Sequence, residues 1–410
     1  EHPRTGDLKM TTDRKIKIAM IKFSGLATGG TERGLQTLAV NLPQDKFDIT
    51  YFYCDSAPYI GSDYIHPTTD PSREHYMRTN GSHVKLVKFH VGQKNITVPS
   101  HTWVNTNFWK VFKEEDFDIV QTARAGHPEY PFVHIKHTPI VDLITLPGMA
   151  DTQSNIAKSV HISNYQKESW VKAGGPEHIA TVIPLLTEFP RPAKPVEDKP
   201  NNRKFFKGKK IKTVFGMHQR PDDGIYSSMP LEAYSRVESF FDEPDNQIGF
   251  VMMGGSKLYQ QQAKELGLKN FEYVPESGDY EDILSFLENI DVFAHGRADG
   301  ETYGMAIAEA IYCGLPIISH TAPAMGHWET MNGCGAMTRD VVGYANNIMH
   351  FSDKSSTEKI FRSNITKQAK ELSLESNIQK WVDVYEEVWA NNKPLESSVD
   401  SNEWLKEWIG

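Results

Sequence analysis

The sequence predicts an α/β protein built from two Rossmann-like domains that face each other across a cleft. The chain has 410 residues, which is too long for one ordinary hydrophobic core and suits two domains of roughly two hundred residues each. Short apolar strands alternate with helical segments in both halves, a pattern typical of parallel sheets. A proline-rich segment, residues 184–200, separates the halves and marks the domain boundary.

The first half opens with a buried strand, a glycine-containing loop and a helix. Residues 15–22 (KIKIAMIK) are expected to form a buried strand, and residues 31–42 have helical apolar spacing. Further strands are expected at residues 48–53, 84–89, 118–122, 139–145 and 159–162, with helices between several of them. The polar segment 56–83 is expected to be a mobile lid, a substrate-recognition loop or disordered.

The second half repeats the alternation of strands and helices. Strands are expected at residues 211–216, 247–253, 270–274, 291–294 and 315–319. Beyond Arg339 the pattern is helical to the end, and residues 378–389 (IQKWVDVYEEVW) carry apolar side chains at helical spacing. The predicted organisation is a first domain at 10–183, a linker at 184–210, a second domain at 211–372 and C-terminal helices at 373–410.

Composition argues against several classes of protein. The 44 basic and 53 acidic residues give a formal net charge of −9, which disfavours nucleic acid as a partner. Three cysteines without CxxC spacing indicate neither a disulfide framework nor a zinc site, and they favour a reducing, cytoplasmic location. No apolar run approaches the roughly 20 residues that span a bilayer. The composition does not decide whether the protein makes peripheral contact with a membrane.

The loop after the first strand reads Gly25-Leu-Ala-Thr-Gly29-Gly30-Thr31. It lacks the lysine of a P-loop and fails the Gly-x-Gly-x-x-Gly dinucleotide pattern, so simple ATPase and dehydrogenase functions are disfavoured. Gly29 and Gly30 let the backbone approach a phosphate or sugar at the N-terminus of the following helix. A tight strand-to-helix turn with no ligand explains the same residues equally well.

A second candidate site lies in the stretch from His295 to His320, where a strand, a glycine-flanked loop, a helix and a strand form one βαβ unit. Glu301 and Glu309 are eight residues apart, which in an ideal helix means a rotation of about 80° and a rise of about 12 Å. A paired acid and base of the glycosidase type is therefore disfavoured. Glu301 can face a reacting sugar, whereas Glu309 can bind a diol or, alternatively, point to solvent.

The segment GETYGMAIAEAIYCGLPII resembles the Glu-x7-Glu signature of retaining glycosyltransferases of family four, which have the GT-B fold. The order of a Gly-Gly-Thr-Glu-Arg loop, a mid-chain linker and a C-terminal helix extends the resemblance over about residues 16–389. It implies transfer of a sugar from a nucleoside diphosphate sugar, with UDP or GDP as the nucleotide, to a carbohydrate or glycan hydroxyl with retention of configuration. It further implies that no cofactor or metal is needed and that the C-terminal helix crosses back to the first domain.

The resemblance also implies roles for individual residues. Glu309 would bind the ribose and Glu301 the donor sugar. The backbone amides of Thr302, Tyr303 and Gly304 would hold the sugar or the diphosphate, in agreement with the field of a helix N-terminus. The nucleotide base would lie beside the loop that follows the strand ending at Val274.

The resemblance implies that Arg220, which matches an arginine of the family, supplies positive charge that neutralises the diphosphate leaving group. The family's lysine is missing, because Asp222 and Asp223 occupy its region. Lys257, Arg124, Arg297 or helix dipoles could supply the missing charge.

The segment Arg124-Ala-Gly126-His127-Pro-Glu129 follows a strand of the first domain. The resemblance implies that His127 lies near the donor sugar, with Arg124 as a phosphate or acceptor contact. Asp116 and Asp118 have the Asp-x-Asp form of a metal site, yet they precede the strand and so belong to the wrong edge of the sheet. The alternatives are an epimerase or sugar phosphorylase of the same fold, and a non-catalytic nucleotide-sugar-binding protein.

Overall fold

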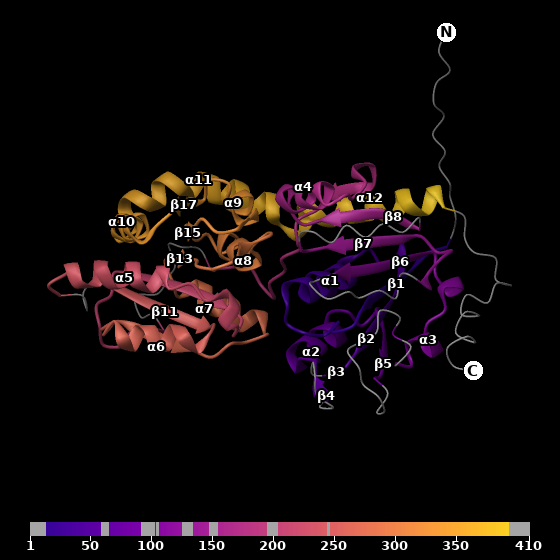
Figure 1. The fold of residues 1–410 in the computed structure, drawn as a ribbon, viewed down its shortest axis with the longest axis horizontal. Helices are drawn as coiled ribbons and strands as arrows, with labels where there is room; N and C mark the ends of the chain where they lie inside the picture. Colours follow the sequence, from indigo (N-terminus) through magenta and orange to yellow (C-terminus); the bar gives the residue numbers. More distant parts are fainter. Residues whose placement is uncertain are drawn as a thin grey trace, which may run out of the picture.

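The computed structural model describes residues 14–58, 65–91, 103, 106–124, 134–146, 155–194, 204–243 and 247–392. Two α/β domains lie next to each other, and each has a parallel sheet at its centre with helices against it (Figure 1). The predicted fold class is therefore confirmed at the level of architecture.

The sheet of the first domain has seven strands in the order β5-β2-β1-β6-β7-β8-β9, all parallel. Its strands are β1 (Ile16–Lys22), β2 (Phe47–Cys54), β5 (Lys85–Phe89), β6 (Ile119–Arg124), β7 (Ile140–Ile144), β8 (Ile156–His161) and β9 (Ala180–Val182). The central β1 pairs on both sides, with Ile18 opposite Ile49 and Ile119. Six of the seven residues of β1 are buried, as expected for a central strand of a parallel sheet that is covered on both faces. The helices are α1 (Gly30–Asn41), α2 (Pro71–Thr79), α3 (Phe108–Val111) and α4 (Asn164–Lys172).

The sheet of the second domain has six parallel strands in the order β12-β11-β10-β13-β15-β17. They are β10 (Thr213–Gln219), β11 (Ile248–Gly254), β12 (Phe271–Val274), β13 (Val292–Ala294), β15 (Ile317–His320) and β17 (Gly335–Thr338). The helices are α5 (Met229–Phe240), α6 (Lys257–Glu265), α7 (Tyr280–Glu288), α8 (Met305–Tyr312), α9 (Gly326–Met331), α10 (Val341–Phe351) and α11 (Lys354–Leu372). The sequence pattern missed β17, because four residues that begin with glycine show no alternation.

The last described helix, α12 (Leu374–Asn391), crosses back and packs on the first domain, as expected for the fold (Figure 1, yellow). Tyr385 is fully buried, and its hydroxyl donates a hydrogen bond of 2.6 Å to Gln121 Oε1 in β6. The two segments that connect the domains, one at the proline-rich linker and one before α12, also meet, because Thr187 and Ser373 form a parallel bridge. Both connections therefore run together along one side of the domain boundary.

The segment 56–83 is more regular than expected where it is described. It contains the strands β3 (Ser56–Pro58) and β4 (Ile65–Pro67) and the helix α2, whereas residues 59–64 lie outside the described residues. The Asp70 side chain caps α2 by accepting hydrogen bonds from the backbone amides of Ser72 and Arg73, and Pro71 is the first helical residue. An N-cap followed by proline is a helix-start signal that outweighs the polar composition.

The proline-rich segment between the domains is anchored up to residue 194. Leu186 and Phe189 are buried, and Arg191 forms ion pairs with Glu281 (2.8 Å) and Glu288 (2.7 Å) of α7. Glu188 also accepts a hydrogen bond of 2.9 Å from Asn41 Nδ2 of α1, so the described part of this segment contacts both domains.

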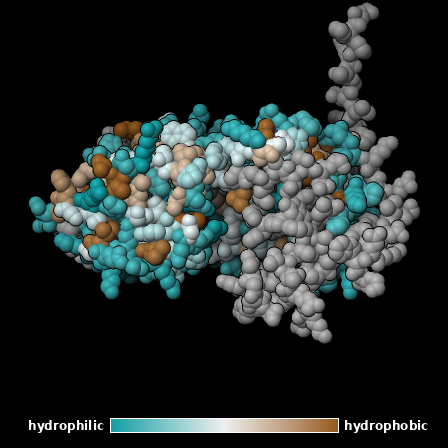
Figure 2. Space-filling view, viewed as in Figure 1, coloured by the Kyte–Doolittle hydropathy of each residue, from teal (hydrophilic) through white to brown (hydrophobic). Residues whose placement is uncertain are grey.

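The described surface is mixed in character (Figure 2), and the three cysteines lie in the interior. On the face that Figure 2 shows, hydrophobic residues of the described part are scattered in small separate patches. No helix within the described ranges is long and apolar enough to cross a membrane. Cys54, Cys313 and Cys334 are buried free thiols.

Candidate functional site

The turn into α8 places the two glutamates. Gly300 and Glu301 form the short strand β14 (Gly300–Glu301), which pairs with β16 (Ala324–Met325). Gly304 then caps α8 with a φ of 90°, a left-handed conformation that glycine adopts without strain. A Cβ atom on Gly304 would lie 3.3 Å from Ile307 Cδ1, so the space is also tight. The turn depends on glycine for both reasons.

Glu309 lies in the second turn of α8, and its side chain is completely buried. Arg33 Nη1 of α1 is 3.3 Å from Glu309 Oε1, and His218 Nε2 at the end of β10 is 3.0 Å from Glu309 Oε2. Burial by itself raises the pKa of Glu309, but the charge of Arg33 and the contact with His218 lower this pKa overall. Glu309 is therefore an ionised carboxylate inside the protein, and it does not point to solvent.

Glu301 has different surroundings. Its side chain is 18% exposed, with His295 Nε2 at 3.5 Å from Oε1 and Arg297 Nη1 at 3.4 Å from Oε2. Burial raises the pKa of Glu301, and the contacts with His295 and Arg297 lower it overall. His295 is itself oriented by Ser319 Oγ, 2.8 Å from Nδ1. The two glutamates thus occupy separate sites, as their spacing predicts.

Thr302 and Tyr303 connect this turn to the first domain. Thr302 Oγ1 donates to the carbonyl oxygen of Thr145 (2.6 Å), and Ser163 Oγ donates to the carbonyl oxygen of Thr302 (2.5 Å). The Tyr303 hydroxyl donates to the carbonyl oxygen of Leu185 (3.4 Å). Since Thr145 and Ser163 lie just beyond β7 and β8, the carboxyl edge of the first sheet faces the turn into α8.

The glycine loop of the first domain meets the same place. Gly29 is the N-cap of α1 and Gly30 is its first residue. A Cβ atom on Gly30 would lie 3.9 Å from Met305 Sδ, at the start of α8. The N-termini of α1 and α8 therefore approach one another across the domain boundary. Both ends carry partial positive charge, an arrangement that favours an anion between them.

A cavity of about 60 Å³ lies next to Glu309 between the domains. Its lining residues lie at the carboxyl ends of β10 and β11, after β10 and β12, in α7, or in the glycine loop and α1: Thr28, Arg33, His218, Gln219, Arg220, Met253, Glu276, Ser277, Gly278 and Ile283. Val274, at the end of β12, immediately precedes this part of the lining. Lys257 is exposed at the start of α6 and does not line the cavity.

The acidic residues that stand where a lysine is expected have internal partners. Asp222 Oδ2 accepts a hydrogen bond from Arg220 Nη2 (2.9 Å), and Asp222 Oδ1 accepts one from the amide of Gly224. Asp223 accepts a hydrogen bond from Ser256 Oγ, the N-cap of α6. These carboxylates hold the loop after β10. Arg220, whose side chain is 58% exposed, stays at the rim of the cavity.

Arg124 and His127 are the two candidates of the first domain that follow from the segment at residues 124–129, and the structure describes only Arg124. The Arg124 guanidinium is buried and lies 2.5 Å from Asp142 Oδ2, between β6 and β7. His127 lies outside the described residues. Their proposed contacts with the donor stay predictions.

The Asp-x-Asp segment lies where its sequence position indicates. Asp118 precedes β6, and it binds Arg14 Nη1 (2.7 Å) and the amide of Lys17 (2.9 Å). In the part of the chain that the structure describes, no group of three or more His, Cys, Asp or Glu side chains is arranged to hold a metal ion.

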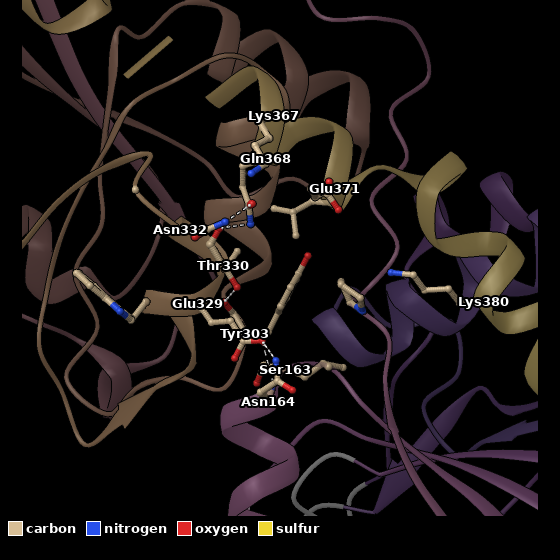
Figure 3. Close-up of a pocket in the computed structure, with 15 residues that line it drawn as sticks. Ser163, Asn164, Tyr303, Glu329, Thr330, Asn332, Lys367, Gln368, Glu371 and Lys380 are labelled. Carbon is tan, nitrogen blue, oxygen red and sulfur yellow. Dashed lines mark hydrogen bonds between the residues drawn. The ribbon is translucent and has the colours of Figure 1, made fainter. Parts of the chain in front are cut away.

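A larger groove of about 790 Å³ lies beside the crossings between the domains. Among the residues that line it, α4 contributes Ser163 and Asn164, and α11 contributes Lys367, Gln368 and Glu371 (Figure 3). Several of its polar groups bind one another: Asn332 Nδ2 donates to Gln368 Oε1 (3.0 Å), Gln368 Nε2 donates to the Thr330 carbonyl (2.9 Å), and Thr330 Oγ1 donates to the Tyr303 carbonyl (2.5 Å). It contains neither Glu301 nor Glu309. We therefore place the candidate site at the glutamates.

Sequence reasoning gave no role to Arg33, His218 and His295. His218 lies one residue before the end of β10 and His295 directly follows β13, so both lie at the carboxyl edge, where ligands bind in α/β sheets, and this position was a usable signal. Arg33 carried a weaker signal, because its partner Glu309 is 276 residues away (309 − 33) in the other domain.

Comparisons with known structures show which fold the chain has. A sucrose-phosphate synthase from Thermosynechococcus elongatus has a similar structure, with a TM-score of 0.68 and 14% identity over 92% of this chain and 100% of that chain. A glycosyltransferase from Rickettsia africae has a TM-score of 0.67 and 16% identity over 92% and 100% of the two chains. The chain has the GT-B fold.

The GT-B assignment extends to a third structure and to the sequence of the second domain. HepE of Anabaena, in complex with UDP and glucose, has a TM-score of 0.66 and 16% identity over 90% of this chain and 99% of that chain. Residues 231–372 match the family described as glycosyl transferases group 1, and this match includes Glu301 and Glu309. A search of curated protein sequences finds no match. The finer assignment to family four stays a prediction.

Proposed function

We propose that this GT-B protein transfers a sugar from a nucleoside diphosphate sugar to a carbohydrate hydroxyl, with retention at the anomeric carbon. The observation that carries the proposal is the arrangement of Glu301 and Glu309 around the N-terminus of α8, opposite the glycine loop of α1. The match of residues 231–372 to glycosyl transferases group 1 supports the same reaction. The complex of HepE with UDP and glucose supports a nucleotide-sugar donor.

Each glutamate has one role in this proposal. Glu309 binds the ribose diol of the donor, because a carboxylate accepts two hydrogen bonds from adjacent hydroxyls. Glu301 binds the donor sugar beside His295. The amides of residues 302–304 and the N-terminus of α1 stabilise the negative charge that develops on the diphosphate.

The acceptor hydroxyl attacks from the side on which the diphosphate leaves. The departing phosphate oxygen takes the proton of the acceptor, and no covalent intermediate with the protein forms. Arg220 at the cavity rim assists the departure of the diphosphate. In this proposal, neither a cofactor nor a metal takes part.

The first experiment is a thermal-shift panel with UDP, GDP, ADP and CMP, since a ligand that binds the folded state raises its apparent stability. Transfer is then assayed with the sugar donors of the nucleotide that binds. Glu309→Ala should abolish the thermal shift, and Arg220→Ala should slow transfer by up to about 100-fold. Arg236→Ala, which removes an exposed arginine of α5, serves as the control. Wild-type behaviour of both site variants would refute the assignment.

A non-catalytic nucleotide-sugar-binding protein is the second candidate. This candidate is favoured because the lysine of the family is missing. Asp223, which lies in the region of that lysine, is instead hydrogen-bonded to Ser256 inside the protein. Slow hydrolysis of the donor without acceptor distinguishes the two, because a pure binding protein should release no free sugar.

A further inference from the structure

The first domain contributes a cation to the candidate donor site. Arg33 lies in the first turn of α1, where its amide donates to the carbonyl of Gly29 (2.9 Å). Its side chain is only 12% exposed and lies over the Tyr280 ring, 5.0 Å from the centroid. It lines the same cavity as Arg220 of the second domain. Two guanidinium groups from opposite domains therefore border one small space.

The polar atoms around this space are incompletely satisfied. Arg33 Nε, His218 Nε2 and both oxygens of Glu309 are buried, and none has a hydrogen bond of good geometry among the described residues. Arg33 Nη1 and His218 Nε2 contact the two Glu309 oxygens at 3.3 Å and 3.0 Å as ion-pair contacts, and neither contact has the geometry of a hydrogen bond. Buried polar groups without partners are costly and uncommon. The contrast with the internally bonded groove in Figure 3 indicates that a polar ligand completes this cluster.

The cavity is too small for that ligand in the present arrangement. Its volume of about 60 Å³ compares with the roughly 300–1,000 Å³ of ordinary ligand pockets. A nucleotide therefore fits beside Glu309 only if Arg33 and Glu309 move apart to make room for it.

We infer that Arg33 binds the diphosphate of the donor, as a cation that the first domain supplies in place of the missing lysine. This inference rests on the proposed function. A ribose held by Glu309 brings the attached phosphates within reach of a guanidinium that already contacts the same carboxylate. The converging N-termini of α1 and α8 favour the anion at this place. Arginine also suits phosphate, because its planar fork donates two parallel hydrogen bonds.

The test compares UDP with uridine on the full chain. Affinity for UDP is measured by titration calorimetry and that for uridine by thermal shift at millimolar concentration. Arg33→Ala should weaken UDP about 10- to 150-fold, as expected for a lost hydrogen bond to a charged group. It should leave uridine within about threefold, whereas Glu309→Ala should weaken both ligands. GDP and guanosine replace this pair if the nucleotide panel selects GDP.

Three results would overturn the inference. If Arg33→Ala lowers the affinity for UDP and for uridine equally, Arg33 only orients Glu309. If the variant binds both ligands more tightly, Arg33 only holds the cleft shut. If neither affinity changes, Arg33 has no role in binding. Failure of wild-type protein to bind UDP or GDP would instead refute the proposed function itself.

Two further variants guard against trivial explanations. Arg33→Gln keeps much of the side-chain length without the charge and replaces Arg33→Ala if that variant does not fold. Arg33→Lys should recover part of the UDP affinity, and a lysine variant no better than glutamine would count against a charge contact. Arg236→Ala controls for the loss of one positive charge from the surface.

Discussion

Arg33 Nη1 and Glu309 Oε1 lie 3.3 Å apart, and this contact joins the first turn of α1 to the second turn of α8. Glu309 is completely buried, so the ion pair is shielded from solvent and weakly screened by salt. Removing one partner of such a pair is costly because the other charge remains buried. The carboxylate of Glu309 therefore belongs both to the contact between the domains and to the candidate ribose site.

Glu309→Gln should destabilise the protein at neutral pH by about 3 kcal/mol, because it leaves the Arg33 charge without its partner. The pKa of Glu309 is lowered in the folded protein, so its stabilising contribution is fully present above the unfolded value near 4.5 and is lost progressively as the pH falls from there through the lower, folded value. Urea unfolding at pH 7 and at pH 3.5 measures both effects. The difference between the wild-type and variant midpoints should be smaller at pH 3.5 than at pH 7; a constant difference would contradict the ion pair.

His295→Asn should slow sugar transfer on the order of tenfold without changing nucleotide affinity, because His295 contacts Glu301 and not Glu309. His295 helps to lower the pKa of Glu301. In the variant this pKa rises, so the acidic limb of the pH–rate profile moves to higher pH. A pH–rate profile of each protein, with nucleotide titration as the control, checks this prediction. A parallel loss of nucleotide binding would indicate a general distortion of the site.

Gly304→Ala should lower the free energy of unfolding by about 1–3 kcal/mol, since the residue has a φ of 90° and little space for a Cβ atom. Gly267→Ala is the matched control: Gly267 has a φ of 63° and no atom within 4 Å of the added Cβ. Denaturant unfolding should show the larger loss for Gly304→Ala. Equal losses would mean that the contacts with Ile307 and His327 adapt at no cost.

Tyr385→Phe should cost about 1–2 kcal/mol, because the variant leaves the buried Gln121 side chain without the hydroxyl that binds it. Lys46→Ala breaks another contact of α12, the pair with Glu386 in which both side chains are 45% exposed. That change should stay within about 0.5 kcal/mol. Thermal unfolding of both variants would test whether α12 is held by its buried face. A larger loss for Lys46→Ala would refute this explanation.

Most of the architecture follows from local patterns in the sequence. Apolar runs such as residues 15–22 and 247–253 lie within or close to the observed β1 and β11, because strands buried on both faces need continuous apolar residues. The helix at residues 378–389 was found from its apolar spacing and lies inside α12. The β17 strand and the α2 helix were missed. The β17 strand is too short to show a period, and the α2 helix is polar and is marked in the sequence only by its N-cap, Asp70.

The sequence by itself determined which residues belong to the turn into α8, because glycine spacing and the separation of Glu301 from Glu309 are local properties. Only the tertiary structure decided their surroundings. Arg33 and His218 reach Glu309 from elements far away in the chain, and Asp223 bonds to Ser256 across a loop. Charge and hydrogen bonding depend on distances in space, which domain packing sets and sequence spacing does not encode. The motif therefore identified the carboxylates, whereas the fold decided which cations face them.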